Sequence, residues 1–535
     1  MPASHADFVF VNGRIFTSDR SMPFADSVGV KDDIVISVGD VDQFVGPKTE
    51  VVELDGALLT PGFIDAHVHV TTSGLDKLRV SFDDCLDAAD ALASIGRYAA
   101  ENPDAPWIIG SGWSQAWFER GCPSAEVLDR VVADRPVLVW NRDGHGAWAN
   151  SAALALAGIS GLTSDPVDGR IERLADGSPQ GTLHEGAVQL VEKHAPEDTV
   201  DEFVSGLLRG QEEMFRYGIT GWQEASVIPP VQEAYLRVAG SGRLIGDAVG
   251  ALWWDRHRGM EQVDDLLERR SRSAPGFRPT TVKLMLDGVA ENYTASLLDS
   301  YLDGAGSMTG NTGVDFIDPD ELTQIVSVLD THGFQCHFHC LGDRAVRSAL
   351  DAVEAALDVN GLNDNRHHLA HLQFVHPDDL PRFARLHAVA NAQPLWACAD
   401  EYQLELTKPY VSAERFGWQY PFGSLLSNGA TLAMGSDWNV STANVMEEIA
   451  VAIIRRSSDD GESLGLPEAI SPESALTAFT MGSAFVNHVE TTRGSLVVGK
   501  KADLAVFDRD PFPDGSFRET KVNLTMVEGV IVYES

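Results

Sequence analysis

The chain has 535 residues and a mass of 57.9 kDa, which is too long for one ordinary domain at roughly 150 residues per domain. Its 40 lysines and arginines against 79 aspartates and glutamates give a formal net charge of −39 at pH 7. That acidity would repel phosphate backbones and anionic lipid surfaces, so nucleic-acid and membrane binding are poor hypotheses. With 44% hydrophobic and 22% charged residues, we expect a soluble globular protein built on one large domain with smaller attachments.

Cysteine use and the N-terminal segment bear on location. The five cysteines are an odd number scattered along the chain, which is not the framework of a disulfide-stapled secreted domain. The first residues lack a basic region followed by an apolar stretch, and the sequence has no uninterrupted apolar run of about 18 residues. We therefore expect a cytoplasmic protein without an export signal or a membrane span.

Both ends of the chain contain short strand-like runs. Near the N-terminus, apolar runs on both sides of Asn12-Gly13 predict a two-residue hairpin. Similar β-branched runs, broken by turn residues, occupy the last stretch of the sequence. Because isolated hairpins are marginal in water, we expect residues 1–60 and 488–535 to combine into one small β-sandwich domain.

Between the ends, eight apolar runs alternate with helix-like stretches, which is typical of βα units on a parallel sheet. The candidate strands are residues 62–70, 218–225, 244–254, 281–288, 334–340, 367–373, 388–394 and 431–437. They predict an α/β fold, a (β/α)₈ TIM-type barrel over residues 61–74 and 216–487. The first two strands are too far apart for one crossover helix, so we expect an inserted α+β lid domain over residues 75–215.

A pair of histidines gives the sharpest chemical signal. His67 and His69 are two residues apart in the first predicted strand, so both imidazoles project to the same side. Paired histidines at this spacing suit one divalent metal, although two hydrogen-bonded structural histidines would show the same pattern. Further candidates fall in or at the ends of later strands, on the face where barrel enzymes build their active sites: Lys283, His339, His371 and Asp437.

At this point several motifs resemble a known family. PGFIDAHVHV, VKLMLDG, HCLGDRAV, HLAHLQFVHPDDLPRF, MGSDWNV and GSLVVGKKADLAVFDRDP are similar to motifs of the metal-dependent amidohydrolase superfamily, in particular its amidohydrolase family 3 branch. N-substituted formamide deformylase is an activity of that branch. The resemblance covers nearly the whole chain, including RPVLVWNRDGHGAWANSAALALAGI in the insertion. The motifs are specific for the superfamily and much less specific for the substrate.

The resemblance implies a binuclear metal centre. It assigns His67 and His69 to the more buried ion and His339 and His371 to the more exposed one. Asp437 would bind the first ion and contact the attacking water. The ions would be two Zn²⁺, although the same ligands accommodate Mn²⁺, Fe²⁺ or Co²⁺.

Lys283 has a special place in this scheme. The resemblance implies that it is N6-carboxylated and bridges both ions, because an ammonium group cannot ligate a cation whereas a carbamate offers two anionic oxygens. Apolar flanks favour desolvation, which lowers a lysine pKa and frees the amine for carbon dioxide. An unmodified lysine in an ion pair, or a single-metal site, is the alternative.

The implied reaction is hydrolysis of a carbon–nitrogen bond other than a peptide bond. Two metal ions would activate a water as hydroxide and polarise the substrate carbonyl, so no side-chain nucleophile is needed. Asp437 would serve as general base and then as general acid. His145, in the loop Asp-Gly-His-Gly, is expected either to enter the active site as a catalytic or substrate-binding donor or only to fix its loop.

Tryptophans suggest the substrate. The candidate substrate-binding residues, chosen from those near predicted strand ends or in the insertion, are Trp113, Trp148, Trp222, Trp253, Trp254, Trp396 and Trp438. They could supply large apolar contact area, although ordinary packing would use the same residues. No cluster of arginines or lysines accompanies the strand ends. The leading hypothesis is therefore a small-molecule N-substituted amide or formamide with a hydrophobic or aryl substituent.

Other functions stay open at this point. A deaminase of the superfamily would carry His-x-x-Glu after the fifth strand, whereas Gly342 occupies the third position after His339. A cyclic amide, carbamate or urea hydrolase needs the same metal chemistry and differs only in pocket shape. A scaffold protein on a hydrolase fold would have lost ligands, and this chain retains all six. A homodimer is expected only because twofold assemblies are common.

Several other polar motifs are interpreted as structural. Cys336 and Cys340 flank His337 and His339 but face the other side of the strand, so a compact zinc knuckle is not expected. His337 is expected to be a packed barrel histidine. His184-Glu185 lacks the second histidine of a metalloprotease motif.

Overall fold

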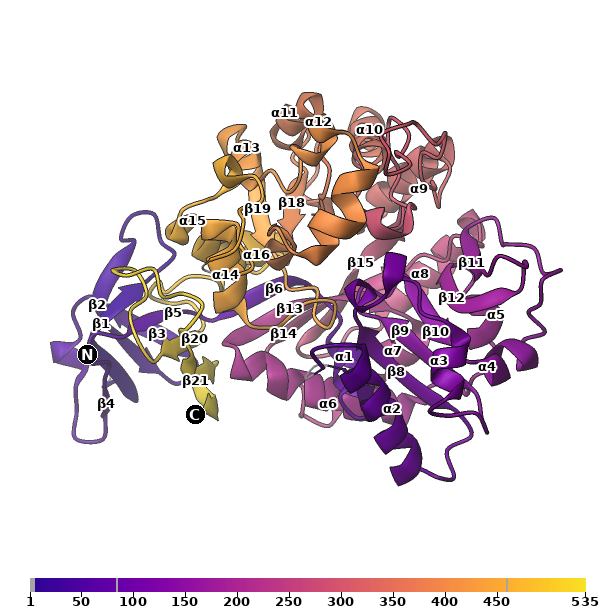
Figure 1. Cartoon of the computed structure of the whole chain (residues 1–535). Helices are drawn as coiled ribbons and strands as arrows, with labels where there is room; N and C mark the ends of the chain where they lie inside the picture. Colours follow the sequence, from indigo (N-terminus) through magenta and orange to yellow (C-terminus); the bar gives the residue numbers. More distant parts are fainter. Residues whose placement is uncertain (1–4, 83–84, 459) are drawn as a thin grey trace.

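The computed structural model describes residues 5–82, 85–458 and 460–535, and its centre is a parallel sheet of eight strands (Figure 1). The strands follow one another in space in their chain order: β6 (Phe63–Val68), β13 (Ile219–Val227), β14 (Asp247–Trp253), β15 (Phe277–Met285), β16 (Gln335–Cys340), β17 (His368–His371), β18 (Val389–Ala392) and β19 (Thr431–Met434). Each of them overlaps one of the eight predicted strands. The α/β barrel-type sheet is therefore confirmed.

The sheet curls until its two edge strands meet. The backbone N–H of Asp437, just after β19, donates to the carbonyl of His67 in β6 at 2.7 Å. The Asn391 side chain in β18 donates to the carbonyl of Ala66 at 2.9 Å. These contacts bring the first and last strands together at their C-terminal ends and leave the barrel nearly closed.

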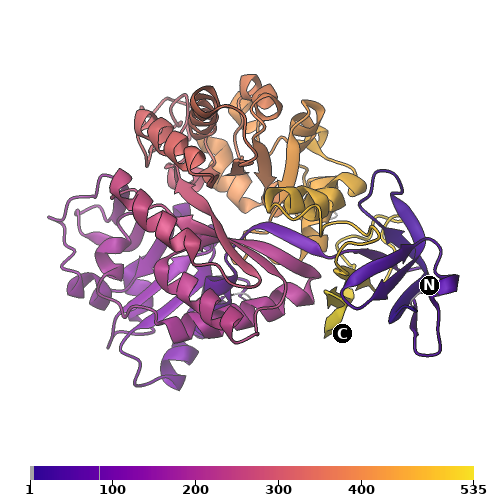
Figure 2. The ribbon, with the colours of Figure 1, turned by 180° about the vertical axis from the view of Figure 1, so that it is seen from behind.

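Helices cover the outside of this sheet (Figure 2). Alanine and larger apolar residues at helical spacing, such as Val346, Leu350 and Val353 in α10, form the buried faces. The helices of this part are α6 (Val200–Arg216), α7 (Pro229–Gly240), α8 (Val263–Ser271), α9 (Pro319–Thr331), α10 (Asp343–Asn360), α11 (Leu380–Arg385), α12 (Ala413–Phe416), α13 (Phe422–Ser427), α14 (Val445–Ile454), α15 (Pro472–Thr477) and α16 (Ser483–Val486).

One helix contact directly supports the end of β6. Helix α1 (Val70–Asp76) begins immediately after His69 and packs against α6. A Cβ atom on Gly74 would lie 2.0 Å from the carbonyl oxygen of Gly206, so only glycine allows the two helices to come this close. This close packing holds the segment that follows His67 and His69 against the barrel.

A second sheet contains strands from both ends of the chain. Its order is β22-β21-β20-β5-β1-β2-β3, with β4 also paired to β1. The strands are β1 (Phe8–Phe16), β2 (Phe24–Lys31), β3 (Ile34–Val38), β4 (Glu50–Glu53), β5 (Leu58–Pro61), β20 (Leu504–Phe507), β21 (Val522–Val527) and β22 (Val530–Glu534). Strand β5 joins the two ends, because it pairs with β1 in parallel and with β20 antiparallel. A two-layer sandwich and the boundaries of the three domains stay predictions.

The predicted hairpin at Asn12-Gly13 is wrong. Both residues lie inside β1, where Asn12 adopts a φ of 58° and the register with β2 shifts between Val11 and Ile15. The turn-forming pair therefore makes an irregularity within one strand. The partner strand β2 starts only at Phe24.

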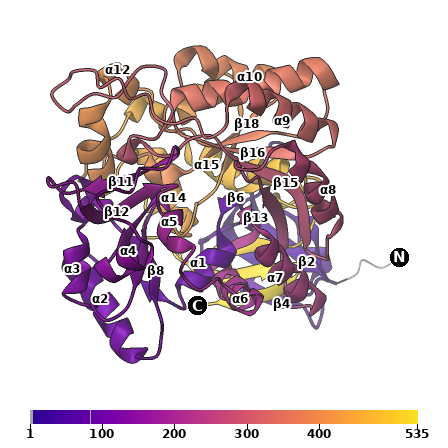
Figure 3. The ribbon, with the colours of Figure 1, turned by 90° about the vertical axis from the view of Figure 1, so that its right-hand side faces the viewer.

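The insertion contains a third, mixed sheet in the order β11-β12-β10-β9-β8-β7. Its strands are β7 (Val80–Ser81), β8 (Ile108–Trp113), β9 (Val137–Asn141), β10 (Gly146–Ala149), β11 (Gly169–Arg173) and β12 (Pro179–Glu185), accompanied by helices α2 (Ala88–Glu101), α3 (Ala125–Asp129), α4 (Ser151–Leu156) and α5 (Gln189–Glu192). The insertion and the terminal sheet lie at opposite ends of the molecule in Figures 1 and 2, and in Figure 3 the terminal sheet lies behind the barrel while the insertion is at the left. Within the three described ranges, no helix is both long and apolar enough to cross a lipid bilayer.

Joining of the two chain ends can be tested through Leu504 in β20. Its side chain is fully buried in a core shared with Phe10, Ile15 and Leu59 from the N-terminal strands. Leu504→Ala should lower the free energy of unfolding by about 2–5 kcal/mol, because it leaves a cavity in this shared core. Val498→Ala, at a position 61% exposed, is the control and should change it by less than about 0.5 kcal/mol. Urea denaturation measures both, and equal effects would contradict the shared core.

Candidate metal centre

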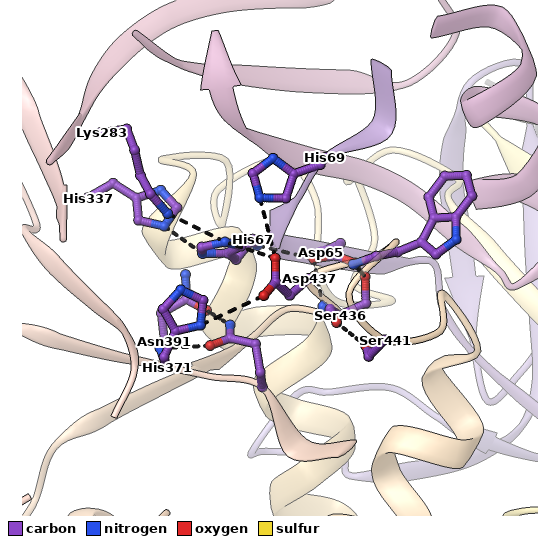
Figure 4. Close-up of polar contacts among 12 residues, drawn as sticks. Asp65, His67, His69, Lys283, His337, His371, Asn391, Ser436, Asp437 and Ser441 are labelled. Carbon is purple, nitrogen blue, oxygen red and sulfur yellow. Dashed lines mark hydrogen bonds and ion pairs between the residues drawn. The ribbon is translucent and has the colours of Figure 1, made fainter. Parts of the chain in front are cut away.

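The C-terminal ends of β6 and β19 bring together two histidines and an aspartate (Figure 4). The Nε2 atom of His67 lies 3.3 Å from Oδ1 of Asp437, and the Nε2 atom of His69 lies 3.4 Å from the same oxygen. Ligand atoms of all three residues lie within 4.8 Å of one another. His67 and Asp437 are buried, whereas the His69 side chain is 24% exposed. The predicted His-x-His pair therefore faces one carboxylate.

The other three predicted ligands surround this group. Lys283, in β15, places Nζ 3.5 Å from Nε2 of His67. His371, at the end of β17, has Nδ1 3.8 Å from Oδ2 of Asp437. The ring of His339, from β16, lies 4.5 Å from that of His371 between centroids. The structure thus brings all six predicted ligands into one cluster.

Several buried polar atoms of this cluster have no hydrogen-bond partner among the residues that the structure describes. They are Nδ1 of His339, both ring nitrogens of His371 and Oδ1 of Asp437. Buried lone pairs without a partner are costly, and a cation would satisfy them. Imidazole nitrogens with a carboxylate oxygen are also a donor set that Zn²⁺ and similar ions prefer. These residues therefore fit a divalent metal.

Burial sets the protonation state of the cluster. It lowers the pKa of His67 to about 3, so that the imidazole is neutral and its lone pair is free to bind a cation. Burial raises the pKa of Asp437, but its contacts with His67 and His69 outweigh this and hold the pKa well below the usual range. Burial also lowers the pKa of Lys283 to about 7, against the opposing charge of Asp437. The site therefore presents neutral imidazoles, an anionic aspartate and a readily deprotonated lysine.

A layer of polar residues orients the ligands. His337 was expected to be a packed barrel histidine, and it is fully buried; its Nε2 atom also lies 2.8 Å from Nδ1 of His67. That hydrogen bond fixes the ring so that Nε2 of His67 faces Asp437. Asp65 accepts hydrogen bonds from the backbone N–H groups of His67 (3.1 Å) and Ser436 (3.0 Å). Asp437 itself has a φ of 52°, so its backbone is held in the sparsely populated left-handed region beside these contacts.

Asp287 also supports the site, and the sequence analysis did not identify it. It is fully buried and accepts backbone hydrogen bonds from Ser296 (2.9 Å), Leu341 (3.1 Å) and Gly342 (2.8 Å). Its Oδ1 atom lies 3.5 Å from Nδ1 of His339. The signal for it was present in the motif VKLMLDG, where the aspartate lies at the end of the predicted strand over residues 281–288.

The structure places His145 beside the cluster. Its ring lies 5.0 Å from that of His339 between centroids, and its Nδ1 atom is 3.0 Å from Oε2 of Glu185. Thr294 donates to the other oxygen of Glu185 at 2.7 Å and so ties this lid residue to the barrel. Burial lowers the pKa of His145, but the charge of Glu185 outweighs it and raises the pKa to about 9. Glu185 was considered from the sequence only within the His184-Glu185 pair, and its contact with His145 was not predicted, because the two residues are 40 positions apart in the chain.

A cavity of about 640 Å³ adjoins the metal centre and includes Trp396 and Trp438 in its lining. Trp396 stacks on His371 at 5.1 Å between ring centroids, with an angle of 6° between the planes. Trp438 directly follows Asp437. Both therefore lie where a substrate would approach the predicted ligands.

The other predicted substrate-binding tryptophans are not part of this lining, so their assignment needs correction. Trp113, Trp148, Trp222 and Trp254 are at most 2% exposed. Trp113 and Trp148 pack with Phe118 inside the insertion, and Trp222 donates to the hydroxyl of Tyr235 in the barrel core. Trp253 is only partly buried but does not line the cavity either. These rings stabilise the fold, because burying a large aromatic side chain is favourable whether or not a ligand is bound.

Two alternative metal motifs are less favourable. Cys336 and Cys340 are buried in the hydrophobic core with Phe338, on the side of the strand away from the cluster, as their spacing predicts. Cys122, Glu172 and His184 also lie close together in the insertion. There, however, Arg170 already pairs with Glu172 at 2.7 Å and neutralises its carboxylate.

A parallel barrel with imidazole and carboxylate ligands gathered at its strand ends is the arrangement of a metal-dependent hydrolase. The amidohydrolase family model matches residues 50–533, and the chain belongs to this family. The predicted family resemblance and the hydrolase class are thereby confirmed.

Individual relatives cover almost the whole chain. Protein LONG AFTER FAR-RED 3 of Arabidopsis thaliana is 31% identical over 528 residues, which cover 96% of this chain and 88% of the relative. N-substituted formamide deformylase of Arthrobacter pascens is 27% identical over 557 residues, which cover 99% of this chain and 98% of that enzyme. The crystal structure of an uncharacterized metal-dependent hydrolase from Pyrococcus furiosus matches with a TM-score of 0.71 at 25% identity, covering 94% of this chain and 99% of that one.

The contact between His145 and Glu185 predicts a pH dependence. Because Glu185 raises the pKa of His145 from 6.5 to about 9, the stabilisation from this histidine is complete below pH 6.5 and is lost as the pH rises through about 9. Imidazole titration by NMR of the metal-free protein should show this midpoint. Glu185→Gln should move it down by at least one pH unit, roughly 1.4 kcal/mol of lost interaction. Glu172→Gln removes a carboxylate beside His184 and is the matched control, which should leave the His145 midpoint unchanged. An unchanged His145 midpoint in Glu185→Gln would contradict the assignment.

Proposed function

We propose that this hydrolase cleaves the C–N bond of an N-substituted amide or formamide with a hydrophobic or aryl substituent. One observation carries the proposal: neutral imidazoles and the Asp437 carboxylate, with unpartnered buried atoms, adjoin a cavity lined by Trp396 and Trp438. The similarity to N-substituted formamide deformylase, at 27% identity, supports this substrate class. Cyclic amides, carbamates and ureas undergo the same chemistry, and the carbamates and ureas are therefore arms of the test below.

The residues that would hold the metal are the six clustered ligands, His67, His69, Lys283, His339, His371 and Asp437. A bound divalent ion, which we propose to be Zn²⁺, supplies Lewis acidity and lowers the pKa of water. Asp437 is anionic and close to the other ligands, so it can accept the proton of the attacking water. It then passes that proton to the leaving nitrogen as the C–N bond breaks, and a carboxylic acid and an amine result.

His145 completes the proposed machinery. Its pKa of about 9 keeps it protonated at neutral pH, and Glu185 holds it from the side of Nδ1. We propose that its other ring nitrogen donates to the substrate's carbonyl oxygen, where negative charge develops as water attacks.

We also propose that Lys283 is N6-carboxylated and that two metal ions bind. Its amine is buried and lies 3.5 Å from a histidine nitrogen, and no described carboxylate is within ion-pair distance of it. A pKa of about 7 leaves much of the amine unprotonated near neutral pH and able to add to carbon dioxide.

Two substitutions test the site. Asp437→Asn keeps the shape but cannot take up the proton, so kcat should fall by about 10²–10⁴-fold or more while the fold is retained. Lys283→Ala should remove one of two bound metal equivalents, measured by mass spectrometry of metals in the purified protein. Asp176→Asn, in an exposed loop, is the control and should leave both unchanged. Wild-type rates and metal content in Asp437→Asn and Lys283→Ala would refute the site.

The substrate class needs its own measurement. N-formyl, N-acetyl, carbamate and urea derivatives of benzylamine and aniline can be compared by the amine that each releases. We expect the N-formyl and N-acetyl compounds to have the highest kcat/KM, since the apolar walls formed by Trp396 and Trp438 fit their aryl groups. A preference for the carbamates or ureas would replace the amide assignment with one of these classes.

A further inference from the structure

The cavity beside the metal centre has a polar face as well as the two tryptophans. This polar face is formed by the carboxylates of Asp143, Glu291 and Asp400 and by the side-chain amides of Gln373 and Gln403. None of the five belongs to the predicted metal ligands or to the residues assigned to catalysis. Nothing in the proposed hydrolysis uses them.

We propose that this polar face binds a cationic group with several N–H donors, such as an ammonium or amidinium, and selects substrates that carry one. The inference rests on the proposed function in one respect, because it names a second substituent of the same amide substrate. It changes the expected substrate from a purely hydrophobic molecule to one with an apolar part and a positive part.

Several buried hydrogen-bond acceptors of this lining have no donor among the described residues. Gln373 and Gln403 are 1% and 4% exposed, and the Oε1 atom of each has no hydrogen-bond partner among the described residues. Their amide nitrogens are already engaged, with Gln419 at 3.2 Å and with Tyr420 at 3.4 Å. Oδ2 of Asp143 is also buried without a partner. Buried acceptors of this kind are expensive unless a donor reaches them, and here the cavity is where a donor can enter.

The carboxylates that line the cavity differ in whether they have an ion-pair partner. Two other carboxylates of the lining are paired, Glu213 with Lys77 at 3.9 Å and Glu447 with Arg518 at 3.4 Å. Asp143, Glu291 and Asp400 have no ion-pair partner within the described part of the chain. They accept ordinary hydrogen bonds, such as that from Thr407 to Glu291 at 2.9 Å.

Arg142 does not offset these three charges. Its guanidinium lines the same cavity and acts on Asp400, and the charge of His145, which is already paired with Glu185, acts on Asp143. Two positive charges therefore face three carboxylates, and one of the two is shared with Glu185. Arg216 acts on Tyr217, at the end of the cavity where Lys77 and Glu213 are paired. Burial chiefly, and the charges of Asp143 and Asp400 to a smaller extent, raise the pKa of Glu291 to about 7, so the three acids repel one another. A cationic ligand would relieve that repulsion, whereas an anionic one would add to it.

The arrangement suits an organic cation better than a metal ion. Among the described residues, the clusters whose ligand atoms converge within 4.8 Å are those around Asp437 and around Cys122, and neither includes these acids. Acceptors spread along a cavity of about 640 Å³ match a group whose N–H donors point in several directions. Trp396, which stacks on His371, lies in the same lining as Gln373. It connects the polar face to the reacting end and can also contact a cation with its ring.

Three planar molecules of the same shape test the proposal by binding to the metal-loaded protein. Benzamidinium is a cation with four N–H donors, benzamide is its neutral counterpart, and benzoate is the anion. Isothermal titration calorimetry should show benzamidinium binding at least about tenfold more tightly than benzamide, the effect of one charge-assisted hydrogen bond. Equal or tighter binding of benzamide or benzoate would overturn the proposal. Because benzoate can also ligate the metal directly, benzamidinium has to bind more tightly than a ligand with that additional contact.

Isosteric variants locate the effect. Glu291→Gln and Asp400→Asn should each weaken benzamidinium binding about tenfold and leave benzamide within twofold. Glu447→Gln is the matched control, since it removes a cavity carboxylate that Arg518 already neutralises, and it should change neither ligand by more than twofold. Equal losses in Glu447→Gln and Glu291→Gln would show only a general effect of charge and would overturn the assignment. The thermal midpoint checks the fold of each variant, and either Glu291 or Asp400 suffices if the other fails to fold.

The binding assay separates this inference from the proposed function. If benzamidinium is selected but no amide of the panel is hydrolysed, the cationic subsite stands and the assigned reaction fails. If amides are hydrolysed but benzamidinium has no advantage, the reaction stands and the subsite fails.

Discussion

The backbone hydrogen bond from Asp437 to His67 is the contact on which the rest of the site depends. It joins the C-terminal ends of the first and last barrel strands at 2.7 Å, and so sets where the carboxylate of Asp437 stands relative to the two histidines of β6. Asp65 strengthens the same junction through Ser436. The junction therefore sets the two edges of the sheet so that His67 and Asp437 face each other.

Desolvation then gives the joined residues their chemistry. The same burial leaves His67 neutral and brings Lys283 close to losing its proton, while contacts with histidines keep Asp437 ionised. A neutral histidine, a readily deprotonated lysine and an ionised aspartate thus lie within a few ångströms of one another. A protein without a bound cation has to tolerate several unpartnered buried atoms here, which is the physical reason to expect a metal.

The inserted domain contributes more than a cover. Through Glu185 and Thr294 it sets His145 beside His339, and the hydrogen bond from Gln115 to Asn292 at 2.9 Å provides a second tie to the barrel. Its loop also carries Asp143 into the cavity. The lining of that cavity therefore combines two tryptophans with a group of hydrogen-bond acceptors, which suits a substrate with an apolar part and a polar part.

The sequence by itself predicted the eight barrel strands and the six residues that cluster at or near their C-terminal ends. Period-two spacing puts His67 and His69 on one face, and parallel strands bring their C-terminal ends to the same edge, so local pattern was sufficient. Only the tertiary structure decided which tryptophans are accessible, since Trp222 is buried within β13 whereas Trp396, just after β18, reaches the cavity. The same holds for the bonds of His337 with His67, 270 residues apart, and of Glu185 with His145. Such pairs carry no sequence period, because the packing of distant segments brings them together.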